Sequence, residues 1–192
     1  MYVPMGDPAR HVVLVGLMGV GKSTVGRRLA KELRRPFADV DEQVELHAGL
    51  TIPAIFRDLG EPRFRRLEAE VLAGLLARDA PLVIAAGGGV VTGAGNRDAL
   101  AAAGAYVVWL RASVEFLARR TDTAHRPLLA FTDATDAADA LGRLLAERAP
   151  LYEQVSDATV DVEPFHVGDD KPKRALARHI AELLTDAAAV ER

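Results

Sequence analysis

The stretch that decides the fold is "HVVLVGLMGVGKST", residues 11–24. Its first part is a short apolar run that ends at Gly16, which is typical of a strand buried on both faces. Gly16, four further residues, Gly21, Lys22 and Ser23 then form the P-loop pattern, in which glycines let backbone N–H groups turn toward phosphate oxygens. A helical pattern follows directly. The stretch therefore predicts a strand, a phosphate-binding loop and the start of a helix.

The same loop indicates how a nucleotide is held. Lys22 is expected to reach the β- and γ-phosphates of ATP, and the Ser23 hydroxyl is expected to ligate Mg²⁺. The N-terminus of the helix adds favourable partial charge for an anion. The motif predicts nucleoside triphosphate binding but specifies no reaction. The predicted ATP contacts in the loop are Gly19, Val20, Gly21, Lys22, Ser23 and Thr24.

Outward from the loop, short apolar runs alternate with helical patterns, which favours an α/β fold with a parallel sheet. We expect one domain over residues 1–192, with two embellishments at 42–79 and about 121–135. Further strands are predicted at 36–41, 81–91, 105–111 and 158–163. Helices are predicted at 22–35, at two or three places within 42–79, up to Arg120, up to about Val155 and from about Lys171.

The composition restricts the possible functions. The 192 residues are 49% apolar, which suffices for a core, and a net charge of −3 argues against a nucleic-acid partner. The absence of cysteine excludes disulfides, thiolate catalysis and cysteine–zinc sites. No apolar run reaches the ~18 residues of a membrane span, and residues 1–10 lack the apolar core of a signal peptide. We expect a cytoplasmic monomer that acts on small molecules.

Two acids, Asp39 and Asp41, lie at the carboxyl end of the predicted strand 36–41. Ligands of open parallel sheets bind at this end of the strands. Because side chains alternate along a strand, Asp39 and Asp41 can share a direction while Val40 is opposed. One acid could then face Mg²⁺ and the other an acceptor. The alternative is that they are the N-cap and first-turn acid of the next helix.

The chain lacks the features of two large P-loop classes. It has no Asn-Lys-x-Asp guanine motif, and neither the strand at 81–91 nor that at 105–111 ends in a Walker B acid. A short P-loop protein with a helical insert at 42–79 and a late polar segment at about 121–135 is typical of a small-molecule kinase. In such enzymes the insert holds the acceptor and the late segment closes as a lid that excludes water.

The insert contains an arginine pair. Arg65 and Arg66 occupy adjacent helical positions in "FRRLEAE" (64–70), so they diverge by about 100° and one can point inward. An inward arginine suits a carboxylate or phosphate of the acceptor, and Glu68, one turn on, can orient it. The alternative is a solvated surface helix with incidental ion pairs.

Three more features can contact ligands. The three glycines at 87–89 let backbone amides approach a ligand closely. Arg120 and Arg126 flank the polar segment "TDTAH", where an arginine could stabilise charge on the transferring phosphoryl group. Arg148 precedes a proline in "ERAPLYE" (147–153). The alternative for Arg148 is a solvated surface residue.

Taken in order, the motifs Gly-x4-Gly-Lys-Ser, Asp-x-Asp, Phe-Arg-Arg-x-Glu, Gly-Gly-Gly, Arg-Pro-Leu-Leu and Arg-x-Pro-Leu-Tyr resemble the shikimate kinase family over residues 11–162. The resemblance implies a three-layer α/β/α fold of the nucleoside monophosphate kinase type, with a five-stranded parallel sheet in the order 2-3-1-4-5. It also implies phosphoryl transfer from ATP, with Mg²⁺, to the 3-hydroxyl of shikimate in aromatic amino-acid biosynthesis.

The resemblance further implies a role for each matching residue. Catalysis would fall to Lys22, Asp41 and the lid arginine Arg126, while Arg120 would lie against adenine. Asp39 would assist Ser23 at the metal. The implied shikimate contacts are Asp41, Arg65, Gly87, Gly88, Gly89 and Arg148, with both arginines on the carboxylate and Gly88 acting through its backbone.

The sequence departs from the family pattern in two places. The segment between Arg120 and Arg126 is one residue shorter than in some relatives, and Phe165 stands where many relatives have an arginine near adenine. Two alternatives to a shikimate kinase remain open. One is a kinase of another carboxylated polyol or cyclitol, such as gluconate, and the other is a non-catalytic nucleotide-binding regulator.

Overall fold

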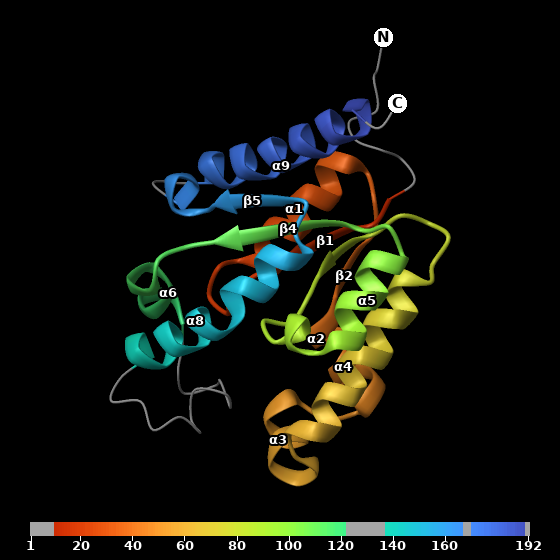
Figure 1. Cartoon of the computed structure of the whole chain (residues 1–192), viewed down its shortest axis with the longest axis vertical. Helices are drawn as coiled ribbons and strands as arrows, with labels where there is room; N and C mark the ends of the chain where they lie inside the picture. Colours follow the sequence, from red (N-terminus) through yellow and green to blue (C-terminus); the bar gives the residue numbers. More distant parts are fainter. Residues whose placement is uncertain (1–9, 122–136, 167–169, 191–192) are drawn as a thin grey trace.

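The computed structural model describes residues 10–121, 137–166 and 170–190. Five parallel strands form one sheet in the order β2-β3-β1-β4-β5, which confirms the predicted fold (Figure 1). The central strand β1 pairs with β3 on one side and β4 on the other. The strands are β1 (Val12–Val15), β2 (Phe37–Asp39), β3 (Val83–Ala85), β4 (Tyr106–Arg111) and β5 (Ala158–Asp161).

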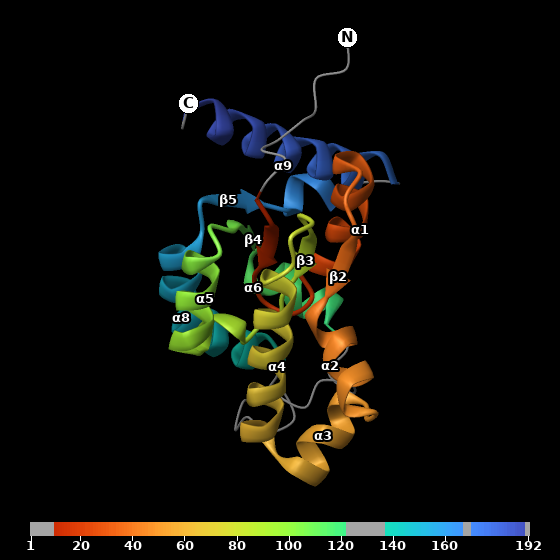
Figure 2. The same ribbon diagram turned by 90° about the vertical axis from the view of Figure 1, so that its right-hand side faces the viewer.

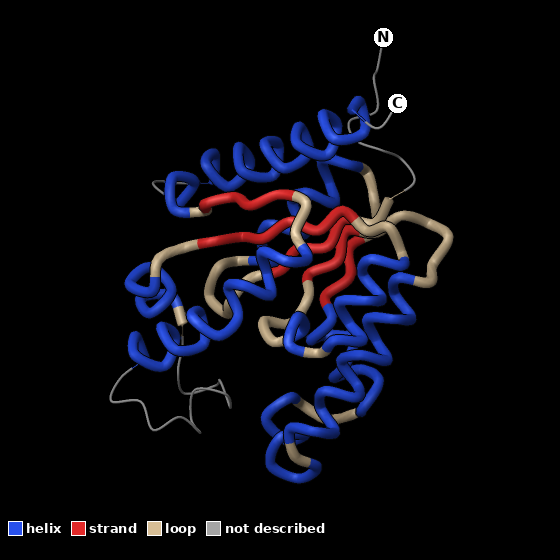
Figure 3. The backbone as a smooth tube through the Cα atoms, viewed as in Figure 1, coloured by secondary structure: helices blue, strands red, loops and turns tan. Residues whose placement is uncertain are grey.

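Helices cover both faces of the sheet and make three layers. Helices α1 (Lys22–Leu33) and α9 (Asp170–Val190) pack together on one face, while α5 (Ala94–Ala102) and α8 (Ala137–Val155) lie on the other (Figures 1 and 3). All four residues of β1 are fully buried. A strand covered on both faces is expected to be apolar throughout, which explains why it appears in the sequence as an uninterrupted apolar run.

The insert forms three helices, α2 (Val40–Ala48), α3 (Ile52–Leu59) and α4 (Glu61–Leu76), which pack on one another. Gly49 and Gly60 separate them with positive φ angles of 65° and 79°, which L-residues with side chains rarely adopt. Helix α3 and the first turns of α4 project beyond the sheet (Figure 2). The insert thus forms a wall beside the carboxyl ends of the strands.

The structure corrects the sequence prediction in three places. The strand predicted at 81–91 is much shorter, because β3 ends at Ala85 and Val90–Thr92 form a short 3-10 helix after the glycines. The second strand is shorter than 36–41, because β2 ends at Asp39 and α2 begins at Val40. Helix α5 was not predicted, although the parallel strands β3 and β4 require a crossover between them. The predicted lid at about 121–135 lies almost wholly outside the described residues, after α6 (Val114–Arg120).

In the described ranges, the model contains no helix that combines the length and the apolar character needed to span a membrane.

Candidate active site

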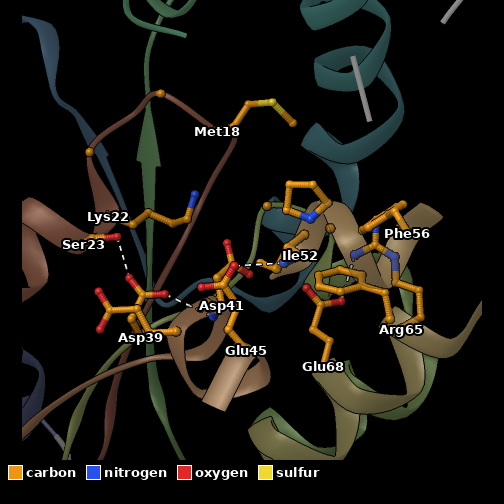
Figure 4. A pocket seen from close by; sticks show the side chains of 18 of the residues that line it. Met18, Lys22, Ser23, Asp39, Asp41, Glu45, Ile52, Phe56, Arg65 and Glu68 are labelled. Carbon is orange, nitrogen blue, oxygen red and sulfur yellow. Dashed lines mark hydrogen bonds and ion pairs between the residues drawn. The ribbon is translucent and has the colours of Figure 1, made fainter. Parts of the chain in front are cut away.

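A cavity of about 630 Å³ lies where β1, β2 and β3 end, between the P-loop and the insert (Figure 4). Parallel sheets bind ligands at this end of their strands. Lys22 and Arg65 are the cations among the described lining residues. The cavity brings together the predicted site residues Gly19, Gly21, Lys22, Ser23, Thr24, Asp39, Asp41, Arg65, Gly88 and Gly89.

The P-loop is shaped to receive an anion. Gly21 is the N-cap of α1 with a φ of 98°, and it has no side chain to accept a bond from the first N–H groups of the helix. Lys22 folds across the loop, with Nζ 2.7 Å from the Gly16 carbonyl oxygen and 3.0 Å from that of Leu17. The ammonium group and the helix N-terminus therefore face the same side of the cavity, where phosphate oxygens bind in such loops.

Ser23 and Asp39 offer oxygen ligands side by side. The Ser23 hydroxyl donates a 2.5 Å hydrogen bond to the Asp39 carboxylate, which is almost fully buried. In the described residues, no group of three or more His, Cys, Asp or Glu side chains could hold a metal ion. Mg²⁺ bound with a nucleotide needs only one or two protein oxygens, since phosphates and waters supply the other ligands. The pair therefore fits a nucleotide-bound Mg²⁺.

The two acids take different structural roles. The Asp39 side chain caps α2 by accepting a 3.1 Å hydrogen bond from the Asp41 N–H. Asp41 lies in the first turn of α2, half-buried, and lines the cavity. Both carboxylates line the cavity, but not through alternation along a strand, because the strand ends at Asp39. The alternative prediction of a cap and a first-turn acid is therefore confirmed, and these structural roles are compatible with a ligand role.

Arg65 is the inward member of the arginine pair. Its guanidinium donates to Glu68 at 2.8 Å and to Glu61 at 3.0 Å, while Arg66 is exposed. The Glu68 side chain is only 1% exposed, and its Oε1 has no hydrogen-bond partner among the described residues. Burial raises the pKa of the Glu68 carboxyl above its usual value, and the adjacent Arg65 charge opposes this shift. Arg65 is therefore held in place at the cavity wall.

The three glycines after β3 allow close packing against these charged groups. A Cβ atom on Gly87 would collide with the Glu68 carboxylate, and one on Gly89 would collide with the Arg65 guanidinium. Gly88 and Gly89 line the cavity, whereas Gly87 lies behind it against Glu68. The three glycines predict a close approach of this loop to a ligand, and the structure shows that part of the approach is to protein side chains.

This packing leads to a prediction. Gly89→Ala should raise the KM for the acceptor at least about tenfold, because the added methyl group displaces Arg65 and weakens a charge-assisted hydrogen bond. Steady-state kinetics would measure this effect. Gly95→Ala is the matched control, since a Cβ there meets nothing within 4 Å. An unchanged acceptor KM in Gly89→Ala would show that Arg65 does not bind the acceptor from this position.

Arg148 lies behind the glycine loop. It is 4% exposed, it is not part of the described cavity lining, and its Nη1 donates a 3.0 Å hydrogen bond to the Gly88 carbonyl. It is therefore not a solvated surface residue. Its Nε has no hydrogen-bond partner among the described residues. Tyr152, one turn further along α8, donates to the same carbonyl.

Sequence reasoning missed an apolar wall of the cavity. The Phe56 and Phe64 rings of α3 and α4 lie 4.8 Å apart between centroids and line the cavity with Met18 and Ile52. Glu45 of α2 holds the start of α3 beside this wall by accepting a 2.8 Å hydrogen bond from the Ile52 N–H. The apolar spacing of these residues indicated only helix packing, so no signal in the sequence distinguished them from core residues. The wall suits the carbon ring of an acceptor.

At the nucleotide-base end of the site, fewer of the predicted residues line the cavity. Arg120 donates a 3.3 Å hydrogen bond to the Gly19 carbonyl and lies over the Phe116 ring, beside the P-loop but outside the cavity lining. His166, and not Phe165, faces the P-loop, since a Cβ on Gly21 would be 3.8 Å from its Nε2, whereas Phe165 stacks on His179. Val20 is buried and does not line the cavity. The predicted lid residue Arg126 lies outside the described residues.

Comparison with known proteins identifies relatives of this chain. A family model described as shikimate kinase matches residues 18–185. A shikimate kinase of Pseudomonas savastanoi pv. phaseolicola is 44% identical over 178 residues, which is 92% of this chain and 97% of that protein. A solved shikimate kinase from Acinetobacter baumannii in complex with shikimate matches with a TM-score of 0.82 and 39% identity, over 93% of this chain and 94% of that one.

A gluconokinase from Sinorhizobium meliloti is also similar, with a TM-score of 0.56 over 96% of this chain and 98% of that one. Its sequence identity of 19% is too low to carry more than a shared fold.

Proposed function

The chain belongs to the shikimate kinase family, and we propose that it transfers the γ-phosphate of ATP to the 3-hydroxyl of shikimate, giving shikimate 3-phosphate and ADP. It is a phosphotransferase with ATP as its co-substrate. The roles are assigned from one observation, which is that two groups of residues line opposite sides of the same cavity. Lys22, Ser23 and Asp39 lie on one side, Arg65 and Glu68 lie on the other, and Asp41 lies between them (Figure 4).

The P-loop side holds ATP. Lys22 and the first N–H groups of α1 bind the β- and γ-phosphates, so that negative charge on the phosphoryl group meets positive charge that is already in position. Ser23 and Asp39 would hold Mg²⁺, which neutralises charge on the phosphates when it is bound. Arg126 is proposed as the lid arginine and Arg120 as the adenine contact, both from their places in the sequence.

The insert side holds shikimate. Arg65 is oriented by Glu68 and Glu61, and it binds the shikimate carboxylate, since a guanidinium fork matches the two oxygens of a carboxylate. Arg148 and the backbone of the glycine loop complete the carboxylate site. The aromatic wall formed by Phe56 and Phe64 packs against the ring of the acceptor.

Asp41 connects the two sides. Its carboxylate binds the shikimate hydroxyls and orients the 3-hydroxyl toward the γ-phosphate. As the new O–P bond forms, the bond from the γ-phosphorus to the bridging oxygen breaks and ADP leaves, while the hydroxyl proton passes to Asp41, which acts as a general base. Holding both reactants in one cavity adds to the rate acceleration, because the transfer becomes effectively unimolecular. We further propose that the enzyme acts as a cytoplasmic monomer, and that residues 42–79 and about 121–135 are the acceptor insert and the lid of a single domain.

The arginine pair provides a prediction with a built-in control. Arg65→Ala should lower kcat/KM for shikimate at least about tenfold, because one charge-assisted hydrogen bond contributes roughly 1.5–3 kcal/mol. The KM for ATP should change far less. Arg66→Ala removes the same charge from the adjacent, exposed position and should leave both parameters unchanged. Steady-state kinetics would measure both variants, and equal weakening for both substrates in Arg65→Ala would contradict the carboxylate assignment.

The proposed acceptor can be tested by comparing turnover with shikimate to turnover with gluconate or with no acceptor. ADP release should be followed with ATP, Mg²⁺ and either shikimate, gluconate or no acceptor. We expect rapid turnover with shikimate and little with gluconate or with water. Faster turnover with gluconate would identify a polyol kinase. Binding of ATP without turnover on either acceptor would favour the non-catalytic regulator.

A further inference from the structure

The carbonyl group of Gly88, in the glycine loop (residues 87–89), accepts hydrogen bonds from two side chains of α8. The Tyr152 hydroxyl donates a 2.5 Å hydrogen bond to it, and Arg148 Nη1 donates one of 3.0 Å. The two donors are four residues apart, so they lie one above the other on the same face of the helix. One donor would satisfy a buried carbonyl group, and the second restricts its direction as well.

Tyr152 is itself rigidly held. Its side chain is fully buried, and its ring stacks on Trp109 of β4 with 5.6 Å between the ring centroids. Burial raises the pKa of the Tyr152 hydroxyl well above its usual value, so the group remains a protonated donor over the whole working range of pH. The hydroxyl therefore has one position and one hydrogen-bonding role.

The direction of this carbonyl determines what the loop presents to the cavity. The Gly88–Gly89 peptide is trans, so its N–H group points opposite to its C=O group. With the carbonyl directed toward α8, the Gly89 N–H points away from α8, and none of the residues that the structure describes accepts a hydrogen bond from it. The same peptide lies against the Arg65 guanidinium. A rotation of this peptide would turn the N–H away and shift the surface on which Arg65 rests.

We propose that Tyr152 is a positioning residue for the acceptor. Its hydroxyl fixes the Gly88–Gly89 peptide, so that the Gly89 N–H and the Arg65 guanidinium present donors to one carboxylate. The proposal rests on the assignment of shikimate to this side of the cavity.

The test removes only the hydroxyl group. Tyr152→Phe retains the ring and its stacking on Trp109, and Arg148 still donates to the carbonyl, so the variant should fold. We expect the KM for shikimate to rise about five- to tenfold, which is the loss expected for one hydrogen bond, while the KM for ATP stays within about twofold. Incorporation of 4-aminophenylalanine at position 152 restores a donor at the same place and should recover most of the affinity.

Tyr106→Phe is the matched control. Tyr106 is also a buried tyrosine, but it lies at the opposite end of the sheet, where it pairs with Val12 at the start of β1. Its variant should leave both KM values unchanged. An unchanged shikimate KM in Tyr152→Phe, an equal rise for both substrates, an equal rise in Tyr106→Phe, or no recovery with 4-aminophenylalanine would each overturn the proposal. The wild-type assay, in which shikimate must be turned over, separates these outcomes from a failure of the proposed function.

Discussion

Lys22→Met should reduce kcat about a hundredfold or more while the protein remains folded. The ammonium group donates to two loop carbonyls and lines the cavity, so its charge serves the phosphate site and is not part of the apolar core. It is needed where charge develops on the phosphoryl group, and a single such donor in a preorganised site contributes on the order of 3 kcal/mol or more. Initial-rate kinetics at saturating substrates, with circular dichroism to monitor folding, would measure the effect.

Lys31→Met is the control for this variant. Lys31 is an exposed lysine in the last turn of the same helix, so the substitution makes the same chemical change outside the cavity. It should leave kcat unchanged. A Lys22→Met enzyme that retained most of its activity would remove the P-loop lysine from the mechanism.

Asp41→Asn should lower kcat by a factor of about one hundred to ten thousand, which is the usual contribution of a general base. Asparagine has nearly the same shape, and Asp39, not Asp41, caps α2, so the helix should persist. The amide can still bind a hydroxyl group but cannot accept its proton. The KM for shikimate should therefore change much less than kcat, as expected for an interaction that matters mainly in the transition state.

Asp98→Asn, on an exposed position of α5, controls for the change of charge. It should have no effect on either parameter. If Asp41→Asn raised the KM for shikimate and left kcat intact, Asp41 would be a binding residue and the proton would leave by another route.

Much of the fold follows from local patterns in the sequence. A strand that is covered on both faces must be apolar throughout, and the P-loop fixes the element before it and the element after it. The insert helices were located because Gly49 and Gly60 interrupt an otherwise helical stretch. Helix α5 was missed because its alanine-rich segment shows no apolar face, and only the topological need for a crossover reveals it.

Site residues could be predicted from the sequence where a residue type in a given pattern has few roles other than ligand binding. Lys22 and the glycine run belong to this class. For Arg65 and Arg66, helical spacing showed that one of them could face inward, but only packing against Glu68 decides which one. The contact of Tyr152 with Gly88 joins residues 64 positions apart. No local pattern encodes such a contact, so the role of that tyrosine depends on the three-dimensional structure.

The position of the transferred phosphate tests the central claim most directly. The enzyme should be incubated with ATP, Mg²⁺ and shikimate, and the product examined by phosphorus NMR with coupling to the ring protons. We predict a single phosphate ester on the 3-hydroxyl, in amounts equal to the ADP formed, because Asp41 and Arg65 hold the acceptor in one orientation. A phosphate ester on another hydroxyl, or inorganic phosphate in place of an ester, would contradict this account of the site.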